Sequence, residues 1–105
     1  MSMSYPTIPI NQLDEWISRG QQMFLVDLRN KSSYERGHIK GAVNIPFEDL
    51  EDRLPELPRE TPIVFYCSRG GQSMLACNHL QPRGWQVVNT AGGTAFYRGK
   101  YMVRT

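Results

Sequence analysis

Residues 62–81, PIVFYCSRGGQSMLACNHLQ, decide the fold, because they place a short apolar strand, a glycine loop and a helix in direct succession. The run Ile63–Tyr66 is apolar throughout, which is typical of a strand buried on both faces of a parallel sheet. Two consecutive glycines then let the backbone turn with positive φ. A helix is expected from about Ser73 to Gln81. Its apolar residues share one face: Met74, Ala76, Cys77 and Leu80.

Short apolar runs alternate with helical patterns over the rest of the chain. Further strands are expected at residues 23–26, 42–45 and 85–88. Helical segments are expected at residues 12–19, 31–36, 47–54 and 94–101. Asn11 and Thr94 are the expected N-caps of the first and last of these helices. The alternation predicts one α/β domain over residues 1–105, with a mostly parallel sheet.

Composition excludes several classes of function. The chain has 105 residues and a net charge of +2, and its basic residues are scattered, so no nucleic-acid partner is expected. Its longest apolar run is too short to cross a bilayer, so no membrane partner is expected. The first eleven residues lack the features of a signal peptide, and two cysteines are few for a secreted domain, which predicts a cytoplasmic location. Two histidines and two cysteines at wide spacing predict no metal site.

Cys67 is the candidate catalytic residue, because it directly follows the clearest strand. Ligands of parallel sheets bind just beyond the carboxyl ends of the strands. A curled glycine loop turns backbone N–H groups inward, and a helix N-terminus adds further N–H groups and a partial positive charge. These donors favour the thiolate, which is the nucleophilic form, and would equally hold a persulfide. The expected substrate-binding residues are those of the loop: Ser68, Arg69, Gly70, Gly71, Gln72 and Ser73. The alternative for Cys67 is an inert core cysteine.

Four segments carry a resemblance to a known family. Asp27-Leu28-Arg29 resembles a D-x-R motif at a strand end, and Glu35 with residues 37–46, GHIKGAVNIP, resembles an E-x-x-x-GHI-x-GA-x-NIP signature with a shorter gap. Residues 67–73, CSRGGQS, resemble a C-x-x-G-x-R-S loop, and Gly84-Trp85 and Gly92-Gly93 resemble a G-[FW] and a GG near the end. The chain therefore resembles a single-domain rhodanese, of the rhodanese-like sulfurtransferase family, over about residues 8–101.

The resemblance implies a five-stranded, mostly parallel central sheet flanked by helices on both faces. It also implies a thiosulfate sulfurtransferase that works by a ping-pong mechanism through a Cys67 persulfide. The sulfur would come from a small-molecule donor such as thiosulfate or a persulfide. It would go to cyanide, a small thiol or a protein thiol. No cofactor is implied, and a monomer is expected.

One departure and two rival functions follow from the same residues. Gln72 stands where the family often has Arg, which predicts a weaker reaction with thiosulfate, and Arg69 is the loop's own cation. A phosphatase or arsenate reductase of the Cys-x₅-Arg type would need Arg at position 73, which is Ser73. A non-catalytic binding or regulatory module is the other alternative.

Structural roles are expected for the remaining reactive side chains. Asp27 is expected to accept backbone N–H groups or to pair with an arginine, and Cys77 to pack in the core. His38 is expected to bond to nearby backbone, and His79 to lie on the helix surface.

Overall fold

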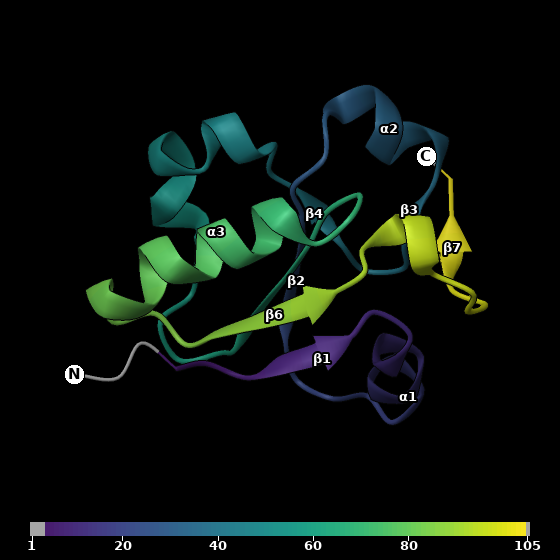
Figure 1. The fold of residues 1–105 in the computed structure, drawn as a ribbon, viewed down its shortest axis with the longest axis horizontal. Helices are drawn as coiled ribbons and strands as arrows, with labels where there is room; N and C mark the ends of the chain where they lie inside the picture. The colour runs from purple at the N-terminus through teal and green to yellow at the C-terminus, as the bar shows by residue number, and fades with distance from the viewer. Residues whose placement is uncertain (1–3, 105) are drawn as a thin grey trace.

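The computed structural model describes residues 4–104, and residues 1–3 and 105 of the expected domain lie outside the described part. The central sheet has five strands in the order β1-β6-β5-β2-β4, and every neighbouring pair is parallel (Figure 1). These strands are β1 (Thr7–Pro9), β2 (Phe24–Asp27), β4 (Val43–Asn44), β5 (Ile63–Tyr66) and β6 (Val87–Ala91). A separate antiparallel pair joins β3 (His38–Ile39) to β7 (Met102–Val103).

Helices cover both faces of the sheet. On one face α3 (Gly71–Leu80) lies beside the 3-10 turns η1 (Phe47–Asp49) and η2 (Glu51–Glu56), and α1 (Gln12–Ser18) covers the other (Figure 1). The remaining helical segments are α2 (Lys31–Arg36), η3 (Gln81–Arg83) and η4 (Thr94–Phe96). Among the described residues, no helix is long and apolar enough to cross a membrane.

Strand β5 lies at the centre of the sheet and is buried along its whole length. Its residues alternate between the two faces, as the pleat of a strand requires. Ile63 and Phe65 pack under α3, while Val64 and Tyr66 pack on the side of α1. The expected α/β domain, with a parallel sheet between two helical layers, is therefore confirmed.

Several local boundaries differ from the sequence expectation. Helix α3 begins at Gly71 rather than Ser73, so that the Ser73 side chain is buried while Met74 is 47% exposed. Met74 is therefore not part of the apolar stripe. The strand expected at 85–88 runs instead from Val87 to Ala91. The pattern also gave no signal for β1, a three-residue edge strand that ends in Pro9, where the missing N–H is tolerated.

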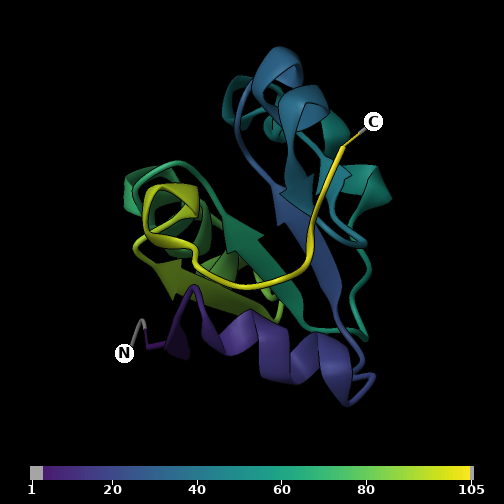
Figure 2. The same cartoon turned by 90° about the vertical axis from the view of Figure 1, so that its right-hand side faces the viewer.

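The expected closing helix at 94–101 is wrong, and the reason lies in α1. Only the turn η4 forms, and the chain then runs extended to β7, as the yellow segment in Figure 2 shows. The Asn11 side chain accepts the Arg98 N–H at 2.7 Å, and Asp14 accepts the Lys100 N–H at 2.9 Å. A helix would need those N–H groups for its own carbonyls. Asn11, predicted as an N-cap, makes no capping bond and anchors this segment instead.

A buried ion pair ties β2 and β5 to the segment that follows α2. Asp27 is fully buried, and its carboxylate accepts from Arg29 Nη2 at 2.7 Å and from the Tyr66 hydroxyl at 2.8 Å. Arg29 also donates to the Gly37 carbonyl at 2.6 Å, and Tyr66 accepts from the Ile39 N–H at 3.0 Å. Burial, reinforced by the charge of Asp27, raises the pKa of Tyr66, so its hydroxyl stays a donor. The expected structural role of Asp27 is confirmed.

We expect Arg29→Ala to reduce the free energy of unfolding by about 3–5 kcal/mol, because it leaves the Asp27 carboxylate buried without its cation. Urea unfolding followed by circular dichroism measures this loss. Arg36→Ala is the matched control, because Arg36 is exposed and makes a local bond to Ser33. Equal stability of the two variants would contradict the account.

Candidate functional site

Cys67 lies at the carboxyl edge of the sheet, directly after β5 and between the ends of β2 and β6. Its side chain is 2% exposed and forms part of the apolar core under α3. The topology therefore delivers this sulfur to the edge where parallel sheets bind ligands, with little of its own surface open to solvent.

The backbone after Cys67 turns back toward the sulfur. The Gly70 N–H donates to Cys67 Sγ at 3.1 Å, and Gly70 has a φ of 100°, which favours glycine. Helix α3 starts at the next residue, and the first N–H groups of a helix have no partner within it. They also carry the positive end of the helix dipole. The sulfur thus receives one backbone N–H from the loop and lies just before the N-terminus of α3, an arrangement that favours an anion.

The Ser73 hydroxyl braces the loop from inside the protein. It lies 2.7 Å from Asn89 Oδ1, 3.0 Å from the Gly70 carbonyl and 3.2 Å from the Thr90 carbonyl. Ser73 is fully buried, so this hydroxyl serves the protein rather than a substrate. The side chain of Ser73, an expected substrate-binding residue, is therefore engaged within the protein, and only its backbone N–H remains for that purpose.

A second glycine turn presses against the backbone of Cys67 and Ser68. Thr94 N–H donates to the Cys67 carbonyl and Ala95 N–H to the Ser68 carbonyl, both at 2.9 Å. Between them, a Cβ on Gly93 would lie 2.4 Å from the Ser68 oxygen, which is closer than real Cβ atoms come. This contact fixes the path of the loop, and the sequence argument had read Gly92-Gly93 only as a turn and a motif.

The other predicted loop residues form an exposed rim. Ser68, Arg69, Gly71 and Gln72 are all exposed, so Arg69 and Gln72 are available to a ligand arriving at the loop. Arg29 is not, because Asp27 holds it. The rim therefore offers one cation and one neutral amide.

The other cysteine and both histidines lie outside this arrangement. Cys77 is fully buried in the core, where burial raises its pKa to about 12, so it remains a protonated thiol. His38 bonds to the Tyr34 carbonyl at 2.8 Å, and His79 lies on the surface beside Glu51. These three structural predictions are confirmed. Within residues 4–104 there is no group of histidines, cysteines and carboxylates that could hold a metal.

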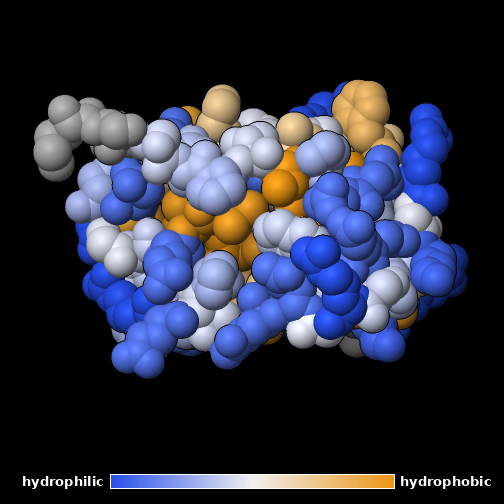
Figure 3. All heavy atoms as spheres, turned by 90° about the horizontal axis from the view of Figure 1, so that it is seen from below, coloured by the Kyte–Doolittle hydropathy of each residue, from blue (hydrophilic) through white to orange (hydrophobic). Residues whose placement is uncertain are grey.

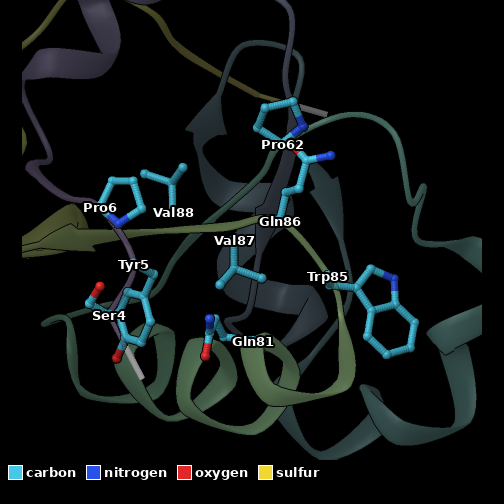
Figure 4. A pocket seen from close by; sticks show the side chains of 9 residues that line it. All are labelled: Ser4, Tyr5, Pro6, Pro62, Gln81, Trp85, Gln86, Val87 and Val88. Carbon is cyan, nitrogen blue, oxygen red and sulfur yellow. The ribbon is translucent and has the colours of Figure 1, made fainter. Parts of the chain in front are cut away.

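A pocket of about 370 Å³ lies at the opposite end of the sheet from Cys67. It is bounded by residues that precede or begin β1, β5 and β6, among them Tyr5, Pro62 and Val87 (Figure 4). Seen from below, the molecule has a hollowed apolar area within a largely hydrophilic face (Figure 3). This pocket shares no lining residue with the Cys67 loop, so its size does not bear on the chemistry of the sulfur.

Comparison with known proteins gives consistent matches. The family profile described as "Rhodanese-like domain" matches residues 10–99. The chain is 30% identical to a putative sulfurtransferase, YtwF, of Bacillus subtilis, over 93% of this chain and 95% of that protein. It is 29% identical to a putative sulfur carrier protein, YrkF, of the same organism, over 92% of this chain but only 53% of that protein. A rhodanese-like domain protein of Staphylococcus aureus has the same fold, with a TM-score of 0.86 at 21% identity and coverage of 95% and 98%.

We expect Gly93→Ala to destabilise the protein by at least about 2 kcal/mol, because the added methyl collides with backbone and a positive φ strains alanine. Thermal unfolding measures this effect. Gly71→Ala is the control for stability, since its Cβ would meet nothing within 4 Å. A Gly93→Ala protein as stable as Gly71→Ala would show that the loop tolerates displacement.

Proposed function

Because the chain belongs to the family of rhodanese-like domains, we propose that it is a sulfurtransferase that carries sulfur as a persulfide on Cys67. Transfer of sulfur is the activity at the level of the family. The finer assignment, including the cysteine and the ping-pong order, is our proposal. It is supported above all by the Gly70 N–H, which points at Cys67 Sγ from 3.1 Å.

The first half-reaction charges the enzyme. The Cys67 thiolate attacks the outer sulfur of thiosulfate, the bond between the two sulfur atoms of the donor breaks, and sulfite leaves with the electron pair. The result is a Cys67 persulfide whose outer sulfur is anionic. The Gly70 N–H and the first N–H groups of α3 stabilise this charge without having to reorganise.

The second half-reaction removes the outer sulfur from the Cys67 persulfide. An acceptor, cyanide or a thiolate, attacks the outer sulfur, the sulfur–sulfur bond to Cys67 breaks, and the electron pair returns to Sγ as thiolate. No electrons are gained or lost overall, so the cycle needs no redox cofactor. Storing the sulfur covalently divides one difficult transfer into two easier ones.

The near-complete burial of Cys67 suits this cycle. Cys67 is 2% exposed, and a persulfide would place the transferable sulfur one bond farther from the buried Sγ. Both cysteines are free thiols, which supports the further proposal of a reducing, cytoplasmic setting. A Cys-x₅-Arg phosphatase is disfavoured, because Ser73 stands at the arginine position and its hydroxyl is engaged inside the protein.

We expect the intact mass of the protein to rise by one sulfur atom after incubation with thiosulfate, and dithiothreitol to reverse the gain. Cys67→Ser should abolish it. Cys77→Ala should retain it, because Cys77 is buried and protonated. A protein that gains no sulfur from thiosulfate or from glutathione persulfide would instead support a non-catalytic binding module.

We expect Gln72→Arg to lower the KM for thiosulfate, because it adds a cation at the exposed rim. An exposed ion pair is worth about 0.2–1 kcal/mol, which corresponds to roughly a 1.5- to 5-fold change. The matched control is Arg69→Gln, which should raise the same KM. Steady-state kinetics at low ionic strength tests both, and unchanged KM values would show that neither position contacts the donor.

A further inference from the structure

A groove of about 320 Å³ lies between α3 and the turns η1 and η2, on the same side of the sheet as the apolar core around Cys67. It is lined by four apolar residues, Phe47, Leu50, Leu75 and Ala76, and by three polar ones, Glu48, Glu51 and His79. In Figure 1 the teal coil that holds η1 and η2 lies above α3.

Leu75 distinguishes this groove from an ordinary surface crevice. It is 53% exposed, although it is a large aliphatic residue on a regular helix with core neighbours on its other side. Scattered exposed apolar residues are normal, but one that lines an apolar groove offers a contact the folded chain does not satisfy. Met74, the adjacent residue, is similarly exposed but does not line the groove.

The groove lies close to the reactive sulfur. Leu50 and Ala76, which line it, belong to the same apolar core cluster as Cys67, on the same side of the sheet. Leu75 stands four residues after the start of α3 at Gly71, which is about 6 Å along the helix axis. A chain segment bound in the groove would therefore have its neighbouring residues near the mouth of the Cys67 loop.

The charge on one side of the groove is strongly negative. Four of the ten acidic residues of the chain lie between positions 48 and 52, although the net charge of the whole chain is +2. Glu51 is bonded to His79 and Arg83, and Arg53 interacts electrostatically with Asp49 as well as with Glu56. Glu48, which is exposed and lines the groove, is the acidic residue that a ligand in the groove would meet. An apolar groove with this edge complements a segment that carries an apolar side chain next to lysine or arginine.

We propose that this groove docks the sulfur acceptor, and that the acceptor is a protein thiol flanked by an apolar and a basic residue. The inference rests on the proposed function. The acceptor thiolate attacks the outer sulfur of the Cys67 persulfide, the sulfur–sulfur bond breaks, and Cys67 regains the electron pair. The acceptor leaves as a persulfide, and the proton of its thiol has passed to solvent. Docking beside α3 raises the local concentration of the thiol at the loop.

Three synthetic peptides with one cysteine each test the proposal. They carry leucine and lysine, leucine and glutamate, or serine and lysine around the cysteine, and the assay measures kcat/KM for discharge of the Cys67 persulfide. We expect the leucine–lysine peptide to react fastest. Leu75→Ser and Glu48→Lys should each slow it by roughly fivefold or more, as removal of a docking contact does. Glu48→Lys should also shift the preference toward the leucine–glutamate peptide.

Cyanide serves as the acceptor that needs no docking. Its transfer rate should be unchanged in Leu75→Ser and Glu48→Lys, and Met74→Ser should leave every rate unchanged. Equal rates for the three peptides, or loss of cyanide transfer in Leu75→Ser, would overturn the docking proposal. So would a dimer in sedimentation that Leu75→Ser dissociates, because a second copy would then occupy the groove. A wild-type protein that takes up no sulfur on Cys67 and transfers none to cyanide or to any of the three peptides would refute the proposed function itself.

Discussion

The close approach of two backbone turns is the constraint on which the site depends. The turn at Gly93 lies against the Cys67 and Ser68 carbonyls with no room for a side chain, and two hydrogen bonds of 2.9 Å close the contact. On the other side of the loop, the Ser73 hydroxyl holds the Gly70 carbonyl against β6. Held from both sides, the loop aims the Gly70 N–H at the sulfur, and a donor fixed in advance costs little reorganisation during reaction.

The buried network around Asp27, on the neighbouring strand β2, also fixes the position of backbone at the carboxyl edge of the sheet. Asp27 and Tyr66 are neighbours in the parallel register of β2 and β5, and Arg29 completes their hydrogen bonding. The network anchors the backbone at Gly37 and Ile39, which lie outside the central sheet. Buried charge contributes little net stability when paired, but it penalises any arrangement that separates the partners. The network therefore fixes the position of the chain segment that contains Gly37 and Ile39 relative to the carboxyl ends of β2 and β5.

The loop around Cys67 and the apolar groove beside α3 are separate parts of the surface. Cys67 is almost fully buried, whereas Arg69 and Gln72 of the loop that follows it are exposed. The apolar groove lies beside α3, the helix that begins directly after the Cys67 loop, whereas the larger pocket lies at the opposite end of the sheet. Under the proposed function, small donors would meet the rim, and the groove would hold a protein acceptor.

The sequence by itself determined those elements whose residues show a clear local pattern of apolar spacing or turn residues. The apolar run Ile63–Tyr66, the following Cys67 and the glycine loop predicted a buried strand, a loop and a helix, because period and turn chemistry are properties of neighbouring residues. Contacts between distant residues decided the rest. Asn11 and Asp14 take the N–H groups of Arg98 and Lys100 and so prevent the closing helix that the local pattern favours. Likewise, β1 forms because it pairs with the edge of β6, and the Ser73 side chain points inward because its hydroxyl bonds to Asn89. None of these partners is adjacent in sequence, so only the tertiary structure could bring them together.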